Sequence, residues 1–235
     1  MKKILLIYAF LSVFAYAQLD NGEYLRRAIP EIGKTWQGYV ILGSGAAVSG
    51  LAMMADETVR SRMTERQYLT PVLDHVADSY VDHYWAFGVS ALGAVARGYH
   101  TDNYLKPLRY WAMSNVSTVA LTYALKFSVR RTRPNGRNDL SYPSGHTSVA
   151  FATASMFQMW YGWKAGVPAY AMAVMTAFQR MDDDQHWLSD VVMGAAVGIA
   201  IPYMIYKGEE NAEAGYAPLS VPISVSIPFN FPSGK

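Results

Sequence analysis

Six apolar stretches follow one another along the chain and dominate its pattern of hydrophobic and polar positions. They are rich in Ala, Leu, Met and Gly, and most of them are too long for an average strand. The charged segments between them lack the period of two that strands show. We therefore predict an all-α fold, a single bundle of about six long helices, built from residues 38–55, 84–96, 110–125, 147–163, 166–178 and 191–206.

The two ends of the chain differ from this middle part. Lys2 and Lys3 precede an apolar run over residues 4–14 and the sequence Ala-Tyr-Ala at positions 15–17, the pattern of a secretory signal peptide. We expect residues 1–17 to be this signal, with a retained signal anchor as the alternative. Near the other end, apolar residues alternate over 219–231 and are interrupted by prolines, which predicts an extended tail over 210–235. Residues 18–209 are then the helical domain.

Hydropathy alone does not decide whether the stretches cross a membrane. None of them reaches the ~20 residues that span a bilayer comfortably, and two are only 13 residues long. An exported chain whose signal is cleaved would return to the cytoplasm after three crossings, which makes a simple spanning topology awkward. We expect an exported bundle on the periplasmic side of the bacterial inner membrane, either membrane-associated or integral.

Composition removes several classes of function. The 235 residues include no Cys, which excludes disulfides, a thiolate nucleophile and a Cys-ligated metal. Lys and Arg number 20 against 18 Asp and Glu, a formal charge of +2, too small an excess for a typical nucleic-acid binder. We expect no nucleic-acid partner and infer no protein partner.

A first cluster of candidate residues lies where the third stretch ends. Lys126 and Arg133 are seven positions apart, and Arg130 is four from Lys126, so a continuous helix would carry all three on one face. Pro134 is expected to end that helix. A solvated basic stripe is the competing interpretation.

A second cluster comes directly before the fourth stretch. Pro143, Ser144, Gly145 and His146 stand at its start. Free backbone N–H groups at a helix N-terminus suit a phosphate oxygen, and Gly145 leaves room for the approach. Taken alone, an ordinary capping turn explains these residues equally well.

A third cluster combines a cation, an imidazole and a carboxylate. His186 and Asp190 are four positions apart, so the carboxylate can orient one ring nitrogen and leave the other as a free lone pair. Arg180 would face elsewhere on a continuous helix, and the acidic run 182–184 is expected to break the helix and to cap a new one.

A stripe of three aspartates is predicted to lie outside the site. Asp74, Asp78 and Asp82 recur every four residues and are flanked by His75 and His83. A solvated helix face is the favoured interpretation of this stripe, with metal binding or substrate gating as the alternative.

Together the three clusters resemble the type-2 phosphatidic acid phosphatase family, which shares its site with vanadium haloperoxidases and bacterial class A acid phosphatases. The resemblance rests on Lys126 with Arg133-Pro134, on the run 143–146, and on Arg180 with His186 and Asp190. One position departs from the family, because Gln179 stands where the residue before the arginine is usually Ser. The departure puts the detail of the pocket in doubt more than the activity.

The resemblance implies a metal-independent phosphatase without a cofactor, acting on phosphomonoesters or pyrophosphates. Lipid substrates are favoured: lipid A, phosphatidate, phosphatidylglycerophosphate or a polyprenyl diphosphate. A soluble periplasmic acid phosphatase is the alternative, and a vanadium-dependent haloperoxidase is a more remote one. The implied roles are as follows: Lys126, Arg133, Ser144, Gly145 and Arg180 bind phosphate, His186 forms a phosphohistidine, Asp190 orients it, and His146 acts as acid and base.

Overall fold

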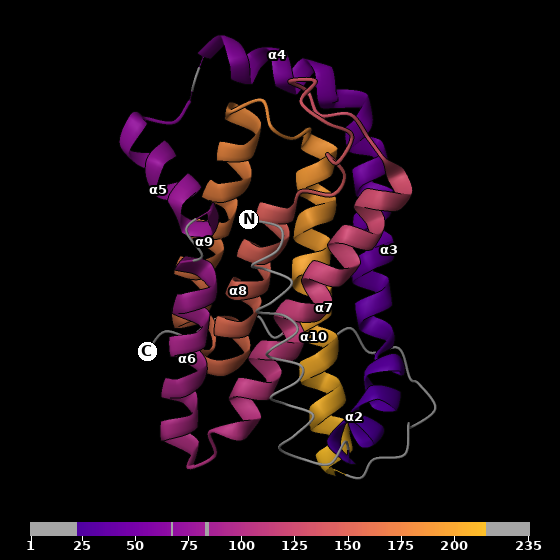
Figure 1. Cartoon of the computed structure of the whole chain (residues 1–235), viewed down its shortest axis with the longest axis vertical. Helices are drawn as coiled ribbons and strands as arrows, with labels where there is room; N and C mark the ends of the chain where they lie inside the picture. Colours follow the sequence, from indigo (N-terminus) through magenta and orange to yellow (C-terminus); the bar gives the residue numbers. More distant parts are fainter. Residues whose placement is uncertain (1–22, 67, 83–84, 215–235) are drawn as a thin grey trace, which may run out of the picture.

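The regular elements of the described residues are all helical, as predicted. The structure, a computed structural model, describes residues 23–66, 68–82 and 85–214, and its helices run mostly along one long axis (Figure 1). The expected signal peptide and the alternating segment 219–231 lie outside these residues. The helices are α2 (Glu23–Gly33), α3 (Trp36–Ala52), α4 (Asp56–Arg66), α5 (Pro71–Asp82), α6 (Trp85–Thr101), α7 (Leu105–Val129), α8 (Gly145–Tyr161), α9 (Trp163–Asp182) and α10 (Leu188–Ala214).

The six apolar stretches correspond to α3 and α6 to α10. Of the three further helices, α5 agrees with the helical interpretation of the acidic stripe, whereas α2 and α4 were not anticipated. Of these, α4 is strongly charged and lies across one end of the bundle (Figure 1). A short 3-10 turn over Met53–Ala55 connects α3 to α4, and the chain changes direction there. At the other end of the described chain, α10 continues to Ala214. Residues 210–214 are therefore helical and do not belong to the expected tail.

Helix α8 is the central element, because it packs against α6, α7, α9 and α10. Its buried face is built from small side chains, among them Ala150, Ala152 and Ala154. Gly194 and Gly198 of α10 press against it so closely that a Cβ at Gly198 would lie 2.4 Å from the Ser148 carbonyl oxygen. Small residues thus set the α8–α10 distance, as expected for closely packed apolar helices, and this contact fixes the two helix starts that carry candidate residues.

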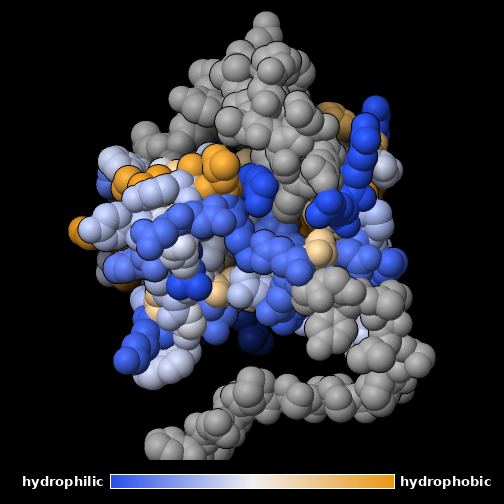
Figure 2. Space-filling model, turned by 90° about the horizontal axis from the view of Figure 1, so that it is seen from below, coloured by the Kyte–Doolittle hydropathy of each residue, from blue (hydrophilic) through white to orange (hydrophobic). Residues whose placement is uncertain are grey.

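Apolar side chains are exposed along the sides of the bundle. Helix α3 presents residues such as Val48 and Leu51 outward, and α6 presents Leu92 and Tyr99. The end opposite α4 is mostly hydrophilic, with hydrophobic residues at its margin (Figure 2). Apolar sides between polar ends are the surface of a membrane-associated bundle.

Two helical spans of the described chain are long and apolar enough to cross a membrane. They cover Trp36–Arg66 and Leu188–Glu213. Only 11% of the apolar window of the first is buried within the protein, against 67% for the second. The apolar part of the first span, which contains α3, is therefore the segment whose composition needs an apolar environment outside the bundle.

Candidate functional site

The first cluster is brought together by a loop and not by a shared helical face. Helix α7 ends at Val129, and Arg130 adopts a left-handed backbone conformation with φ 48°. Arg130 is exposed, and its Nε donates to the Phe127 carbonyl. The expectation that Arg130 and Arg133 continue the face of Lys126 is therefore wrong. The left-handed residue ends the helix before Pro134 is reached.

Lys126 is buried in the last turn of α7 and points toward the second cluster. Its Nζ donates to the Leu140 carbonyl at 2.6 Å and to the Ser141 carbonyl at 3.2 Å. A Cβ placed on Gly145 would lie 3.8 Å from Lys126 Cε, an ordinary van der Waals distance. The ammonium group thus lies close to the start of α8.

Arg133 reaches the third cluster from its loop. Its Nη1 donates to the Gln185 carbonyl at 3.3 Å and to Gln185 Oε1 at 3.0 Å, while its Nε donates to Asn138 at 3.2 Å. Burial lowers the pKa of Arg133 below its usual value, and the positive charge of Arg180 adds to this effect. The guanidinium groups of Arg133 and Arg180 therefore repel each other, and an anion bound between them would relieve this repulsion.

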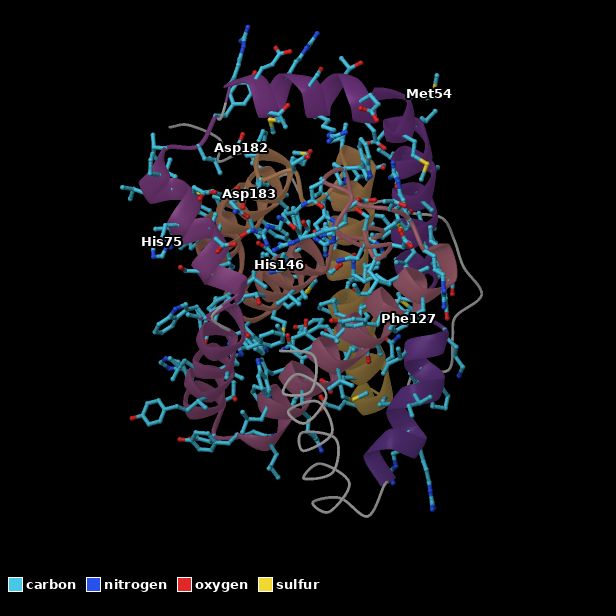
Figure 3. All side chains as sticks on the ribbon, turned by 45° about the horizontal axis from the view of Figure 1, so that its top comes forward. Met54, His75, Phe127, His146, Asp182 and Asp183 are labelled. Carbon is cyan, nitrogen blue, oxygen red and sulfur yellow. The ribbon has the colours of Figure 1, made fainter. Side chains whose placement is uncertain are left out.

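The start of α8 is tied directly to the start of α10. The Ser144 N–H donates to the Asp190 carbonyl at 2.9 Å. Ser144 Oγ accepts from the Thr147 N–H at 3.4 Å and from the Thr147 hydroxyl at 3.0 Å, so its own proton is left to donate elsewhere. His146 follows in the first turn of α8, half-buried, and Figure 3 shows it in the interior of the bundle.

His186 and Asp190 form a buried pair at the start of α10. The helix begins at Leu188, so His186 precedes it and Asp190 lies in its first turn. Asp190 Oδ2 lies 3.4 Å from His186 Nδ1, accepts the Trp187 N–H at 2.9 Å, and accepts the Ser141 hydroxyl. The contact to Nδ1 leaves Nε2 as the ring nitrogen that can carry a free lone pair.

The imidazole of His186 is held in its neutral form. Burial lowers the pKa of His186 to about 3; the hydrogen bond to Asp190 opposes the shift, and the charges of Lys126 and Arg133 reinforce it. A neutral imidazole beside a carboxylate and close to cations is suited to attack an anionic electrophile.

Arg180 closes the site from α9, and Asp78 contacts it. Arg180 Nη2 lies 2.5 Å from Asp78 Oδ1 and 3.4 Å from Asp183 Oδ2, while Arg180 Nε donates to Gln179 at 2.6 Å. The interpretation of the α5 stripe as a solvated face is therefore wrong for Asp78. Burial and the charge of Asp74 raise the pKa of Asp183, with Arg180 opposing them, so acidic groups gather around this arginine.

The acidic run 182–184 breaks the helix as expected but does not cap the next one. Asp182 accepts the backbone N–H groups of Tyr68 and Leu69 at 3.1 and 3.3 Å. Asp184 pairs with Arg60 of α4 at 2.8 Å. These carboxylates connect the break to the segments after α3, and Figure 3 shows Asp182 and Asp183 on the side of the bundle where α4 lies.

Three polar residues at the site were missed. Arg131 Nη1 donates to Asp190 Oδ1 at 3.0 Å, Ser141 donates to the same carboxylate, and Asp56 pairs with Arg131 at 2.7 Å. Arg131 and Ser141 stand within a few positions of the recognised clusters, which is a weak signal that could have found them. Asp56 only follows an apolar stretch, and nothing in that pattern marks it.

The described residues therefore bring Lys126, Arg133, Arg180, Ser144, His186 and Asp190 into one network. Within the same described part of the chain, no three His, Asp or Glu side chains converge in the arrangement of a metal site. What the network does offer is three cations, a helix N-terminus and a neutral imidazole. That combination can bind a tetrahedral anion and attack its central atom.

Comparison with known proteins points to the same region. Residues 107–213 match the PAP2 superfamily model. The chain is 44% identical over 84 residues to the lipid A 1-phosphatase of Porphyromonas gingivalis, a match that covers 34% of this chain and 19% of that relative. It is 34% identical over 62 residues to the lipid A 4'-phosphatase of Helicobacter pylori, covering 26% of this chain and 31% of the relative.

A probable diacylglycerol pyrophosphate phosphatase of Schizosaccharomyces pombe is 32% identical over 81 residues, covering 28% of this chain and 29% of the relative. The chain thus spans between 19% and 31% of the length of these curated relatives.

The fold also matches a solved structure. It is similar to the crystal structure of a transmembrane PAP2-type phosphatidylglycerolphosphate phosphatase from Bacillus subtilis, with a TM-score of 0.57 and 16% sequence identity, over 72% of this chain and 92% of the other. At that identity the likeness concerns the fold. The three residue clusters, the matched segment and the helical arrangement agree, and residues 107–213 of this chain form a PAP2 superfamily domain.

Proposed function

We propose that this protein is a metal-independent phosphatase that hydrolyses phosphomonoester or pyrophosphate groups, foremost those of a lipid, through a phosphohistidine. The observation that carries the proposal is the buried, neutral His186 beside Asp190 and close to Lys126 and Arg133. A nucleophile that must approach a phosphate needs its own charge suppressed and that of the phosphate neutralised. This arrangement supplies both conditions.

The binding part of the reaction falls to the cations and the start of α8. Lys126, Arg133 and Arg180 neutralise the phosphoryl oxygens, and the Ser144 hydroxyl and the Gly145 N–H add fixed donors. Donors held rigidly in this way stabilise the transition state, because they need no reorganisation when charge develops. Phosphoryl transfer depends mostly on such positioning and charge neutralisation.

The bond-making part falls to the two histidines. The lone pair on His186 Nε2 forms the bond to phosphorus, and the P–O bond electrons leave with the departing oxygen. Asp190 stabilises the imidazolium that results. His146 protonates the leaving oxygen and later takes a proton from the water that hydrolyses the phosphohistidine.

A lipid substrate is favoured by the surface of the bundle. Exposed apolar side chains on α3 and α6 fit contact with a membrane, and the relatives named above are phosphatases of lipid A and of diacylglycerol pyrophosphate. Lipid A, phosphatidate, phosphatidylglycerophosphate and polyprenyl diphosphates are the substrates to compare.

The test is phosphate release by the full chain in detergent or liposomes. We expect turnover of at least one of these lipids to exceed that of p-nitrophenyl phosphate, inhibition by vanadate, and no effect of EDTA. His186→Ala is the inactive control. Higher turnover of p-nitrophenyl phosphate than of any lipid would favour a soluble-type acid phosphatase, and an EDTA loss restored by a divalent cation would contradict the metal-independent mechanism.

The side of the membrane is a separate part of the proposal. We place the site on the periplasmic face, supported by the signal-like pattern of residues 1–17. Arg62 is exposed on α4, the helix whose first residue, Asp56, contacts Ser189 beside Asp190, and the chain has no native Cys. An impermeant thiol reagent should therefore label Arg62→Cys in intact spheroplasts. Labelling only after lysis would place the site in the cytoplasm.

A further inference from the structure

Asp56 is a buried carboxylate that connects the N-terminal part of the chain to the site. It is the first residue of α4 and lies outside the PAP2 domain. Asp56 Oδ1 accepts the Ser189 N–H at 2.9 Å, and Oδ2 accepts the Ser189 hydroxyl at 2.7 Å and Arg131 Nη2 at 2.7 Å. Both oxygens of this buried carboxylate are therefore satisfied by hydrogen bonds, as a polar group removed from water requires.

Arg131 joins this carboxylate to the one beside His186. Its Nη2 binds Asp56, and its Nη1 binds Asp190 Oδ1 at 3.0 Å and Ser189 Oγ at 2.5 Å. The guanidinium carbon also lies 5.1 Å from the centroid of the Trp187 ring. A planar guanidinium is suited to bridging two carboxylates with separate nitrogens.

The two oxygens of Asp190 therefore have different partners. Oδ2 faces the His186 ring, whereas Oδ1 faces Arg131. Asp56, Arg131 and Asp190 together carry a net charge of −1. If Asp56 were neutral, Arg131 would be paired with Asp190 alone, and less negative charge would remain to stabilise an imidazolium.

We propose that Asp56 is a positioning residue that acts through Arg131: by neutralising this arginine, it preserves the negative charge that Asp190 presents to His186 during phosphohistidine formation. The inference rests on the proposed function. It makes an N-terminal residue part of a site whose other members belong to the PAP2 domain.

Asp56→Asn tests the charge while retaining the shape and an acceptor for the Ser189 N–H. We expect kcat to fall by about ten- to hundredfold, while KM changes by less than about threefold because Lys126, Arg133 and Arg180 are intact. The matched control is Asp184→Asn. Its partner Arg60 lies 5.4 Å from the same Trp187 ring, and kcat is expected to stay within about twofold. Equal losses in the two variants would overturn the proposal.

The double variant Asp56→Asn/Arg131→Gln separates this role from a structural one. Removing the guanidinium restores the charge balance at Asp190, so the double variant should have a higher kcat than Asp56→Asn alone. A structural role predicts an equal or lower kcat, and that result would overturn the inference. Should Asp56→Asn not fold, Arg131→Lys is used, because Lys keeps the charge but cannot bridge both carboxylates; unchanged kcat there would count against it.

The ring of His186 provides a measurement that needs no turnover. The chain has five histidines, so ¹⁵N-histidine NMR can identify the His186 signals by their loss in His186→Ala. Asp56→Asn should shift them and Asp184→Asn should not. If the wild type hydrolyses no phosphate but Asp56→Asn still shifts the His186 signals, the proposed function is refuted and the positioning role stands. An active wild type whose kcat and ring signals are unchanged by Asp56→Asn would refute the positioning role.

Discussion

The two sides of the candidate site are held in different ways. On one side, His186 and Asp190 are buried, and their partners are held by further hydrogen bonds: the Ser141 carbonyl accepts from Lys126, and Arg131 donates to Asp56. On the other side, Arg180 is buried, but its carboxylate partners are not. The side chain of Asp78 is 35% exposed and that of Asp183 is 43% exposed.

This difference separates two tasks of one site. The nucleophile needs a fixed tautomer and orientation, and a buried network provides them. The arginine needs a partner that a phosphate can replace, and a partly hydrated carboxylate leaves at small cost because water takes over its hydrogen bonds. The His186 side is thus preorganised, whereas on the Arg180 side the carboxylate partners of the arginine can be replaced by phosphate.

Asp190→Asn should produce the largest effect, because it breaks the preorganised side. The amide cannot accept at both positions as the carboxylate does, so the His186 tautomer is no longer fixed. We expect kcat to fall by about 10⁴-fold, as when the orienting carboxylate of another His-dependent enzyme is replaced. Vanadate affinity should change little, since the cations remain. A large loss of vanadate affinity would mean that Asp190 shapes the anion pocket itself.

The pH dependence of the free energy of unfolding tests whether water is excluded from the His186 ring. The pKa of His186 is lowered to about 3 in the folded state, against about 6.5 when unfolded. Between these values the unfolded state binds a proton that the folded state does not, so stability falls as pH falls from about 6.5 toward 3.

This contribution can be isolated with His186→Asn. Between pH 6.5 and 5, the wild type should lose at most about 1.4 kcal/mol per pH unit more than the variant, measured by thermal or denaturant unfolding in detergent. Parallel pH profiles for the two proteins would show that water reaches the ring.

Asp78→Asn should have the smallest effect, and it should improve substrate binding where the other substitutions impair the enzyme. The amide oxygen can still hold Arg180, but the charge that competes with phosphate is gone. We expect KM to fall by up to about fivefold with kcat nearly unchanged, which corresponds to about 1 kcal/mol for a partly exposed pair. Asp139→Asn is the control, because it removes a charge from an exposed loop where Asp139 accepts from Thr132. A higher KM for Asp78→Asn would mean that Asp78 holds Arg180 in its working position.

Local sequence was sufficient where the chemistry lies within a few residues. The Ser144–His146 run and the His186–Asp190 pair each involve only neighbouring residues. Ser144 is the N-cap of α8, and Asp190 Oδ2 lies 3.4 Å from His186 Nδ1, although His186 precedes α10 and does not share its helix. The helical character of the apolar stretches was equally predictable, because it depends on composition and length. The boundaries of the helices were less predictable. Arg130 ends α7 by adopting a left-handed backbone conformation, and nothing about an arginine side chain predicts this.

The remaining features were decided by tertiary structure alone. Asp56 and Arg131 are 75 positions apart, and Asp78 and Arg180 are 102 apart. No periodic pattern connects residues at such distances, since periodicity describes which face of an element is apolar and not which element covers it. The α5 stripe illustrates the limit: its spacing is that of a solvated face, and only the packing of α5 on α9 brings Asp78 to Arg180. The sequence determined which residues can do chemistry here, and the packing of α4, α5 and α10 decided which charges stand beside them.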